Sequence, residues 1–349
     1  MFNEILPRLS SQFADIELII RLPGGSYSDI DSANIRTIKD WNLKPRRFLS
    51  KLSRSVGDIR SRALKAQVFH STYYSDSSGS IPKTVVNAYD FVHERYPAMY
   101  DISRTLAKKK KEQLEKANAV VAISQSTRAD ILSYTDTDES KISVIYPGVS
   151  SVFLEPLDEL AFASISKQYA LNRPYWLFVG QRGHYKNFGT VLRAFAQVAP
   201  SMEIDLAVVG GGTEIDPWHW DYLIKNKLER RLHLLSRLDD RSLCAVYKKA
   251  AGFIFPSLLE GFGIPIVEAM ACETPVIASD IPVFHELAEE AALYFDPHSQ
   301  DALADAMLQV LDSNTRLRLV SSGRERVPLF SWDIAATKLG HIYQRLGSL

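Results

Sequence analysis

The chain has 349 residues, which is enough for about two domains of ordinary size. Its 41 Lys and Arg residues balance its 41 Asp and Glu residues, and 46% of all residues are hydrophobic, which is typical of a soluble globular protein. No stretch reaches the run of about 18 uncharged apolar residues that a membrane span requires. Charges near the N-terminus exclude a signal peptide, so we expect a cytoplasmic protein without a nucleic-acid partner. The two cysteines, Cys244 and Cys272, are expected to be buried as small hydrophobic side chains.

The neutral total hides an asymmetry between the two halves of the chain. Residues 1–150 carry 22 Lys and Arg against 17 Asp and Glu, a net charge of +5, whereas residues 151–349 carry 19 against 24, a net charge of −5. Ten of the basic residues lie in 35–65, where apolar side chains such as Trp41 are interleaved with them. We expect this segment to contact anionic lipid headgroups or phosphates at the inner face of the cell membrane. A solvated helix face explains the lysine run 108–111 equally well.

Short apolar runs, each bounded by turn residues, alternate with helical patterns along the chain. The predicted strands form two series: 16–22, 67–71, 83–90, 119–124 and 142–148, and then 175–180, 205–210, 232–236, 252–257, 275–279 and 292–296. The predicted helices are 2–13, 100–117, 125–134, 187–198, 219–228, 240–250, 264–272, 299–312 and 333–346. Continuous apolar strands that alternate with helices favour parallel sheets that are covered on both faces.

Two such series predict an α/β protein with two doubly wound, Rossmann-like domains. We place the domains in residues 1–150 and 151–330, and we expect a C-terminal helix in 331–349 that packs back toward the N-terminal domain. A doubly wound domain usually opens with a strand and a glycine-rich turn, whereas this chain opens with the helical pattern 2–13. We therefore expect the N-terminal sheet to lack its first strand. Ligands of open α/β sheets bind beyond the carboxyl ends of the strands, so with two domains we expect the site in the cleft between them.

The sequence FPSLLEGFGIPIVEAMACETPVIASD, residues 255–280, joins a buried strand to a helix through a turn that contains two glycines. Pro265 lies in the first helical turn, where its missing N–H costs nothing. Backbone N–H groups at such a helix start attract phosphate oxygens. Glu260 and Glu268 stand at the two ends of the turn, and each carboxylate can accept a pair of hydrogen bonds from a vicinal diol. A hexose and a ribose joined through a diphosphate, as in a nucleotide sugar, present their groups in that order.

These residues resemble the signature of the retaining glycosyltransferases of family 4, which have the GT-B fold and are also described as glycosyl transferases group 1. The match is not limited to the two glutamates, because the flanking strand, the glycines and the proline also agree with the signature. The resemblance covers residues 118–349 and is weaker before them. It continues through VGQRGHYKNF (179–188), VVGGGTE (208–214), LSRLDDRSLCAVYKKA (235–250) and FSW (330–332).

The resemblance implies a role for each residue of the predicted donor site. Glu260 would hold hydroxyl groups of the donor sugar, and Glu268 would hold the ribose hydroxyls. Arg182 and Lys186 match the basic pair that stabilises negative charge on the leaving diphosphate, so Glu260, Arg182 and Lys186 are the predicted catalytic residues. The further residues that the resemblance adds to the donor site are Gly180, Leu238, Gly261, Phe262, Gly263, Ile264 and Asp90.

The N-terminal domain departs from the family pattern at one position. Many relatives carry a His-Asp pair where this chain has Tyr89 and Asp90, so Asp90 matches the pattern and the sugar contact of the missing His is left open. His70 or His93 could replace it, but a lone His near a strand end is more often structural. Ser124 or Ser126 is expected to cap the helix that follows the strand 119–124.

Two other classes of enzyme fit the sequence less well. Asp-x-Asp motifs that hold a metal occur in glycosyltransferases of another fold, but 29–31 and 136–138 lie in polar loops and are expected to be solvated turns. The histidines show no metal-ligand spacing, so no metal is expected. A dinucleotide-binding loop at 208–214 would require a third glycine at the position of Ile215, which argues against an NAD-dependent oxidoreductase.

The function implied by the resemblance is transfer of a hexose from a nucleoside diphosphate sugar to a hydroxyl group, with retention of configuration and without a metal or other cofactor. UDP-glucose is the first candidate donor and GDP-mannose the second. The expected acceptor is a glycan or a polyprenyl-diphosphate-linked glycan of polysaccharide or lipopolysaccharide biosynthesis. Because the first strand and glycine loop are expected to be missing, a non-catalytic nucleotide-sugar-binding protein is the open alternative.

Overall fold

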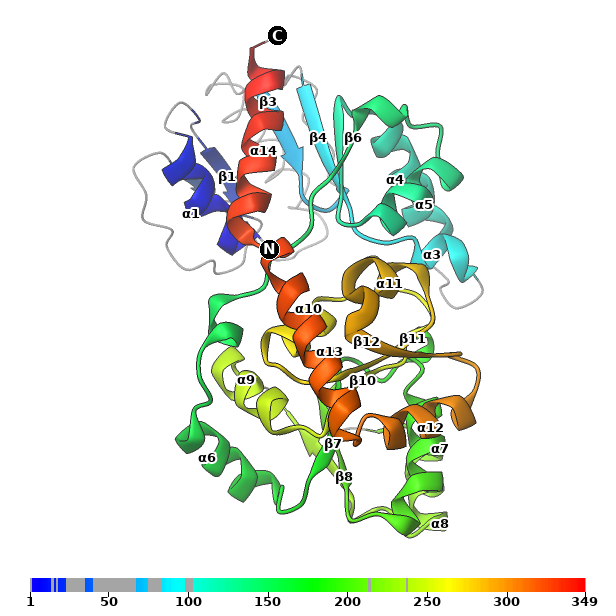
Figure 1. Ribbon diagram of the computed structural model, residues 1–349. Helices are drawn as coiled ribbons and strands as arrows, with labels where there is room; N and C mark the ends of the chain where they lie inside the picture. The colour runs from blue at the N-terminus through cyan, green and yellow to red at the C-terminus, as the bar shows by residue number, and fades with distance from the viewer. Residues whose placement is uncertain are drawn as a thin grey trace. The chain divides into compact units, whose positions relative to one another are not determined.

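The computed structural model describes residues 2–13, 16, 18–22, 35–39, 67–74, 83–97, 103–212, 215–236 and 238–348 (Figure 1). The chain divides into two compact units. Unit 1 consists of residues 1–148 and 331–349, and unit 2 consists of residues 149–330. Each unit contains its own parallel sheet, and each is described by itself below.

The sheet of unit 2 has six parallel strands in the order β12-β11-β10-β7-β8-β9. The strands are β7 (Tyr175–Val179), β8 (Asp205–Val209), β9 (Leu232–Leu235), β10 (Gly252–Phe255), β11 (Val276–Ser279) and β12 (Ala292–Phe295). The chain builds the sheet outward from β7 through β8 to β9, and then crosses to the other side of β7 to start β10. The strand order therefore reverses between β7 and β10, and ligands of doubly wound sheets bind at the carboxyl ends of the strands at such a switch point.

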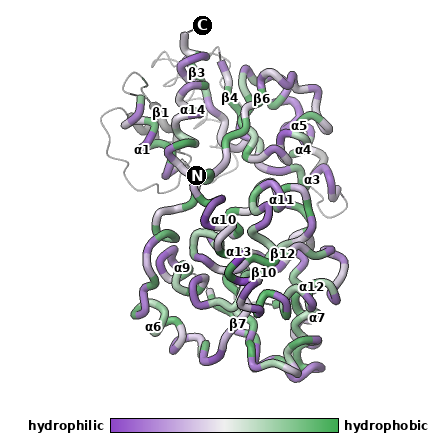
Figure 2. The backbone as a smooth tube through the Cα atoms, viewed as in Figure 1, coloured by the Kyte–Doolittle hydropathy of each residue, from purple (hydrophilic) through white to green (hydrophobic). Residues whose placement is uncertain are grey.

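Eight α-helices accompany this sheet among the described residues of unit 2. They are α6 (Glu159–Tyr169), α7 (Phe188–Val198), α8 (Pro217–Lys225), α9 (Asp240–Lys249), α10 (Ile264–Ala271), α11 (Pro282–Ala288), α12 (Gln300–Gln309) and α13 (Ser313–Arg326). Figure 2 shows hydrophobic residues along the central strands, where every residue of β8, β10 and β11 is buried. The core between the sheet and α7 includes Trp176 and Phe195, whose rings meet edge to face at 6.2 Å. The apolar strands predicted from 175–180 onward are thereby confirmed.

Unit 1 has a four-stranded parallel sheet in the order β3-β4-β5-β6 and a separate parallel pair, β1-β2. The strands are β1 (Leu18–Leu22), β2 (Ile35–Lys39), β3 (Val68–Ser71), β4 (Lys83–Ala88), β5 (Ala119–Ala122) and β6 (Ile142–Val144). The helices are α1 (Phe2–Gln12), α3 (Val92–Arg95), α4 (Ser103–Lys116), α5 (Gln125–Tyr134) and α14 (Trp332–Gly347). Ser124 caps α5 by accepting a hydrogen bond from the Thr127 N–H, as the sequence predicts.

The last helix, α14, packs against α1 at the start of the chain. Both helices contribute to one buried cluster that includes Leu9, Phe13 and Leu339. The Phe13 ring lies directly over Gly340, where a Cβ atom would come within 2.1 Å of the ring. Gly340 thus gives the Phe13 ring the space that any larger residue would occupy.

Some sequence predictions for unit 1 lie beyond the described residues, and others need revision. Trp41 and most of the basic segment 35–65 lie outside the described residues, but the segment opens with strand β2, which the charge pattern does not predict. In the lysine run of α4, Lys110 is 2% exposed, and its Nζ donates to Glu94 Oε2 at 2.9 Å. The run is therefore not a continuous basic surface. The missing first strand stays a prediction.

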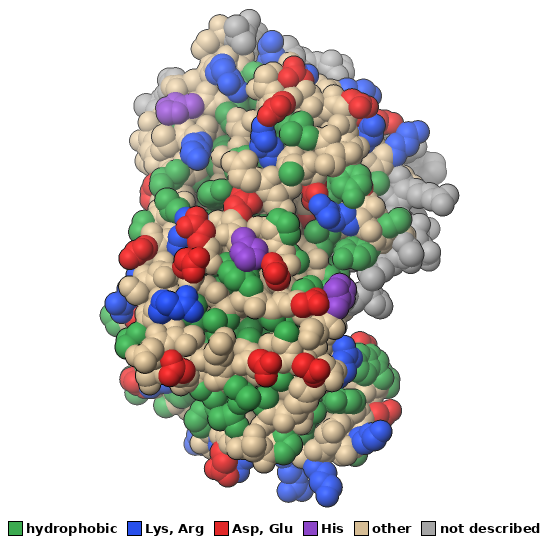
Figure 3. All heavy atoms as spheres, turned by 45° about the vertical axis from the view of Figure 1, so that its right-hand side comes forward, with side chains coloured by type: hydrophobic (Ala, Val, Ile, Leu, Met, Phe, Trp, Pro, Cys, Tyr) green, Lys and Arg blue, Asp and Glu red, His purple; other side chains and the backbone are tan. Residues whose placement is uncertain are grey.

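The surface carries both signs of charge. On the face drawn in Figure 3, acidic and basic side chains are interspersed over the described residues. Within the described part of the chain, no helix combines the length and the apolar character needed to cross a membrane.

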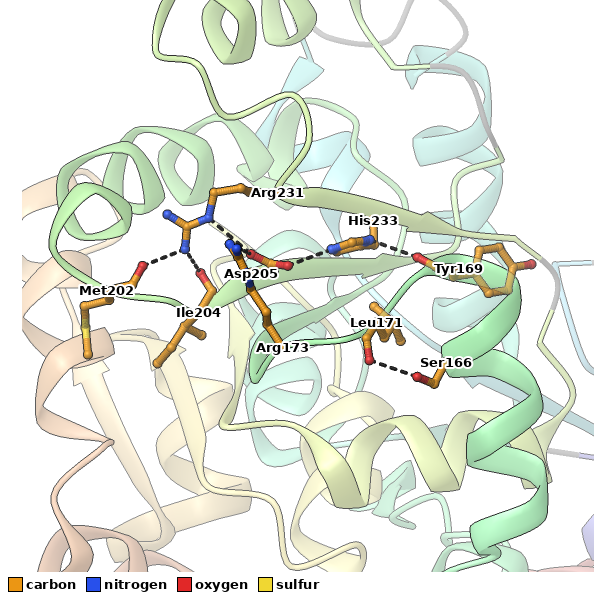
Figure 4. A network of polar contacts seen from close by, with 9 residues as sticks. All are labelled: Ser166, Tyr169, Leu171, Arg173, Met202, Ile204, Asp205, Arg231 and His233. Carbon is orange, nitrogen blue, oxygen red and sulfur yellow. Dashed lines mark hydrogen bonds and ion pairs between the residues drawn. The ribbon is translucent and has the colours of Figure 1, made fainter.

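A polar network joins the amino ends of β8 and β9 in unit 2 (Figure 4). The buried carboxylate of Asp205 lies 3.1 Å from Arg231 Nε and 3.0 Å from His233 Nε2. Arg231 also donates to three backbone carbonyls, those of Ala199, Met202 and Ile204. The network lies at the edge of the sheet opposite to the carboxyl ends of the strands, so we assign it to stability of unit 2.

Candidate functional site

The loops that follow β7 and β10 bring together the candidate residues of unit 2. Gly180 ends β7 with φ of +146°, and its N–H donates to the Val209 carbonyl at 2.9 Å. A short 3₁₀ helix, η4 (His184–Lys186), then leads into α7. The loop after β10 carries Ser257 and Glu260 toward α10. Both loops start at the switch point of the sheet, which is the position that the strand order favours for a ligand.

Arg182 braces the glycine loop that follows β8. Its guanidinium is buried and donates to three successive backbone carbonyls, Gly210 at 2.7 Å, Gly211 at 2.9 Å and Gly212 at 3.2 Å. These glycines have φ of +92°, +70° and +75°, a conformation that residues with a side chain rarely adopt. Burial lowers the pKa of Arg182 from its ordinary value, although a guanidinium stays charged at neutral pH. Arg182 therefore places a fixed positive charge beside the carboxyl ends of β7 and β8.

Lys186 and Glu260 form an ion pair between the two loops. Lys186 Nζ lies 2.5 Å from Glu260 Oε1, and the same oxygen accepts a hydrogen bond from Ser257 Oγ at 2.7 Å. The side chains are 18% and 14% exposed, so the pair is largely shielded from water. The loops are also joined through the backbone, because the Leu258 N–H donates to the Tyr185 carbonyl at 2.8 Å. Residues 74 positions apart in sequence thus share one polar site.

The turn between Glu260 and α10 requires glycine at position 263. Gly263 is the N-cap of α10 and has φ of +137°. A Cβ atom there would lie 3.3 Å from the side chains of Phe284 and Leu287. Gly261 and Phe262 are buried next to it, and the Phe262 ring meets Phe330 edge to face at 5.9 Å. The helix start is therefore held by packing, and α10 presents the positive end of its dipole from a fixed position.

Glu268 lies one turn inside α10 and is supported by a residue that sequence reasoning missed. The hydroxyl of Tyr247, on α9, donates to Glu268 Oε2 at 3.1 Å. Burial raises the pKa of Glu268 to about 7; the Tyr247 hydrogen bond acts in the opposite direction, and the charge of Asp240 raises the pKa further. The Tyr247 backbone carbonyl in turn accepts a hydrogen bond from Thr274 Oγ1 at 2.7 Å. Glu268 is therefore a carboxyl group that can change its protonation near neutral pH.

The two cysteines belong to the same part of the chain: Cys244 lies in α9, and Cys272 is the C-cap of α10. Cys244 and Cys272 are buried free thiols whose sulfur atoms are 3.7 Å apart. Their side chains meet where α9 contacts the end of α10, and both are buried, as the sequence predicts.

Leu238 and Asp90 are two further predicted site residues, and they belong to different units. Leu238 is half-buried in the turn between β9 and α9, and its neighbour Asp239 caps α9 by accepting from the Ser242 N–H at 2.8 Å. The preceding residue, Arg237, lies outside the described residues. Asp90 belongs to unit 1, where its carboxylate accepts from the Val92 N–H at 3.2 Å at the start of α3.

One histidine candidate of unit 1, His70, is hydrogen-bonded through both ring nitrogens. His70 Nδ1 lies 2.5 Å from the Tyr343 hydroxyl, and His70 Nε2 lies 2.8 Å from Asn87 Oδ1. Burial lowers the pKa of His70 to about 4, so its imidazole is neutral and serves as a link between β3, β4 and α14. Asn87 also donates to the Tyr89 hydroxyl at 3.2 Å. This link supports the structural reading of His70.

Among the described residues, no three His, Cys, Asp or Glu side chains gather closely enough to hold a metal ion.

Family comparisons agree on both units of the chain. Residues 162–326 match the family model described as Glycosyl transferases group 1, and residues 4–152 match the model described as Glycosyltransferase Family 4. These two models together account for most of the sequence.

Two curated relatives and one solved structure illustrate the similarity. O-antigen chain mannosyltransferase B of Escherichia coli is 27% identical over 250 residues, which cover 70% of this chain and 65% of the relative. O-antigen chain mannosyltransferase RfbU of Salmonella typhimurium is 30% identical over 201 residues, which cover 57% of this chain and 53% of the relative. The chain thus spans between about half and two thirds of the length of these relatives. Sucrose-phosphate synthase from Thermosynechococcus elongatus has the same fold, with a TM-score of 0.77, 23% identity and coverage of 98% of this chain and 92% of that one.

Proposed function

Because this chain belongs to the family 4 glycosyltransferases, we propose that it transfers a hexose from a nucleoside diphosphate sugar to a hydroxyl group of a glycan acceptor. The observation that carries the proposal is the pairing of Lys186 with Glu260 at the switch point of the unit 2 sheet. A cation and a carboxylate held side by side suit a ligand that presents a diphosphate next to hydroxyl groups.

The donor would lie along the carboxyl ends of the strands from β7 to β10. Lys186, the start of α10 and the charge of Arg182 would stabilise the diphosphate. Glu260 would accept hydrogen bonds from the hexose, and Glu268 would accept them from the ribose. Leu238 and its neighbours would face the nucleobase. Asp90, in the other unit, is assigned to the sugar by the family resemblance alone.

The proposed reaction retains the configuration at the anomeric carbon and uses no metal ion. The leaving diphosphate takes the proton of the acceptor hydroxyl while the new glycosidic bond forms on the same face of the sugar. Negative charge grows on the leaving phosphate as the old bond breaks, so fixed positive charge stabilises the transition state more than the ground state. Lys186 supplies that charge as an ammonium group, and Arg182 supplies it from its fixed position behind the glycine loop.

The proposed acceptor is a glycan that grows on a polyprenyl diphosphate carrier. The support is the net charge of +5 on residues 1–150 and the names of the two mannosyltransferase relatives, which act on O-antigen chains. A basic half would draw the protein to anionic lipids at the inner face of the cell membrane. Sedimentation with vesicles that contain anionic lipid tests this contact, because binding that ignores both lipid charge and salt would contradict it.

Two donors are considered because different observations favour them. UDP-glucose is the first candidate from the sequence, whereas the two mannosyltransferase relatives favour mannose, for which GDP-mannose is the candidate. A panel of nucleotide sugars separates them by thermal stabilisation, because a ligand that binds the native state raises the melting temperature. The donor that stabilises most should also be consumed when an acceptor glycan is added.

The same panel addresses the alternative of a non-catalytic protein. A chain that binds a nucleotide sugar yet neither hydrolyses nor transfers it would be a binding protein. A chain that none of the nucleotide sugars stabilises would contradict the proposed function itself. For variants of Glu260, the matched control is Glu273→Gln, because Glu273 pairs with Arg324 on the exposed surface of the same unit.

A further inference from the structure

The residues proposed to hold the two halves of the donor are each other's partners. Lys186 is assigned to the diphosphate and Glu260 to the hexose, yet Lys186 Nζ lies 2.5 Å from Glu260 Oε1. A diphosphate that takes the ammonium group must therefore draw it from the carboxylate or share it. Binding of the two halves of the donor is coupled through this contact.

The surroundings of the pair keep the carboxylate in place. Ser257 Oγ holds the same Glu260 oxygen at 2.7 Å, and the loops are joined by the hydrogen bond from Leu258 to Tyr185. The Lys186 ammonium also lies 5.1 Å from the centre of the Tyr185 ring and 5.5 Å from that of Phe255. Glu260 is therefore held by Ser257 as well as by Lys186.

Two electrostatic effects then act against a nucleoside diphosphate that carries no sugar. The diphosphate oxygens draw the Lys186 ammonium away from the shielded Glu260 carboxylate. Loss of one partner from a shielded ion pair costs free energy, which weakens binding. The diphosphate is itself an anion and repels Glu260 at short range. In the intact nucleotide sugar, hydroxyl groups of the hexose donate hydrogen bonds to Glu260, which compensates the carboxylate.

We propose that the Lys186–Glu260 ion pair makes this protein discriminate the intact nucleoside diphosphate sugar from the nucleoside diphosphate that remains after transfer. The proposal rests on the proposed function and adds to it the basis for product release. Once the hexose has left, Glu260 competes with the product diphosphate for Lys186. The nucleotide product is then bound less tightly than the donor.

The test is the variant Glu260→Gln, which keeps the size of the side chain and removes its charge. Isothermal titration calorimetry gives Kd for UDP and UDP-glucose and for GDP and GDP-mannose, with wild-type protein and with the variant. We expect the variant to bind the matching nucleoside diphosphate about tenfold more tightly and the nucleotide sugar about tenfold more weakly than wild type does. Glu273→Gln, which removes a charge from an exposed pair, is the control and should change neither Kd.

The inference predicts that the variant changes the two Kd values in opposite directions. A general loosening of the site would instead weaken the binding of both ligands. A variant that binds the nucleoside diphosphate with unchanged or lower affinity overturns the inference. The wild-type protein provides a second test in case the variant does not fold: equal affinity for a nucleotide sugar and its nucleoside diphosphate also overturns the inference. If wild type binds none of the four ligands, the proposed function fails as well. Equal binding therefore overturns the inference alone, whereas absence of binding overturns both.

Discussion

The hydroxyl of Tyr247 donates a hydrogen bond to Glu268 Oε2 at 3.1 Å, which links the middle of α9 to the second turn of α10. Tyr247 is fully buried, and its ring meets Phe153 and Phe253 edge to face. The hydrogen bond is thus fixed by packing. It orients the carboxyl group assigned to the ribose, and it partly offsets the rise in pKa that burial causes.

The variant Tyr247→Phe should raise the pKa of Glu268 above about 7, because it removes the hydrogen bond that stabilises the carboxylate. At pH 7 we expect the affinity for the nucleotide sugar to fall about tenfold, the size of a hydrogen bond to a charged group. At pH 9 the affinity should return close to that of wild type, because the carboxyl group is ionised in both proteins. Kd measured across this range checks the prediction, and an equal loss at every pH would point to a purely structural role.

Glu268 should also make the stability of the protein depend on pH. Its pKa is about 7 in the folded chain and about 4.5 in the unfolded chain, so the folded state binds more protons between these values. The free energy of unfolding should therefore fall as pH rises from about 4.5 to about 7, by a contribution on the order of 3 kcal/mol. Besides burial, the hydrogen bond from Tyr247 lowers the pKa of this carboxyl group, and the charge of Asp240 raises it. Urea unfolding of Glu268→Gln should lack this contribution, and an unchanged pH dependence in the variant would contradict it.

Asp205 should be essential to the stability of unit 2 and irrelevant to its ligand. The variant Asp205→Ala leaves Arg231 without its carboxylate, and removal of one partner from a buried pair costs about 3–5 kcal/mol. Denaturant unfolding measures the loss, with Glu273→Ala as the control at an exposed pair, where we expect no resolvable change. The affinity for a nucleotide sugar under native conditions should stay the same, since Asp205 lies at the amino end of β8.

The packing of α1 on α14 should depend on Gly340. An Ala side chain there would meet the Phe13 ring, so Gly340→Ala should destabilise the protein by about 1–3 kcal/mol. The double variant Phe13→Ala with Gly340→Ala should be more stable than the sum of the single effects predicts, because the first change makes room for the second. Gly347→Ala is the helix control, since the nearest atom to its added Cβ is 3.5 Å away. Additive single effects would show that the two residues do not interact.

The sequence predicts the strands of unit 2 well, but it misses several helices. The strands of unit 2 are short apolar runs between turn residues, and these runs give β7 to β12 within one or two residues. Helix α11 was not predicted although it buries four residues, since it is only seven residues long. Helices α6 and α13 were not predicted either: α6 buries only Ile165, and α13 buries only Leu319 and Gly323. A helix that buries so few side chains has no apolar stripe to reveal it.

The site could be predicted in its charged residues but not in its internal contacts. Glu260 and Glu268 could be predicted to grip two diols at the two ends of the turn because both residues belong to one continuous segment. The partners of these residues lie far away in sequence: Tyr247 is 21 positions before Glu268, and Lys186 is 74 positions before Glu260. Such pairings depend on how the strands are ordered in the sheet, which no local pattern encodes. Likewise, nothing in the segment around Arg182 indicates that it donates to the carbonyls of Gly210, Gly211 and Gly212.

Lys186 is proposed to stabilise the diphosphate of the donor and Glu260 to hold its hexose. The rate of hexose transfer by Glu260→Ala and by Lys186→Ala tests these two roles most directly. Turnover is measured with the donor that stabilises wild type most, and circular dichroism confirms that each variant is folded. We expect kcat to fall more than about a hundredfold in both variants, because each loses a group that stabilises the transition state. Wild-type turnover by a folded Glu260→Ala protein would contradict the account.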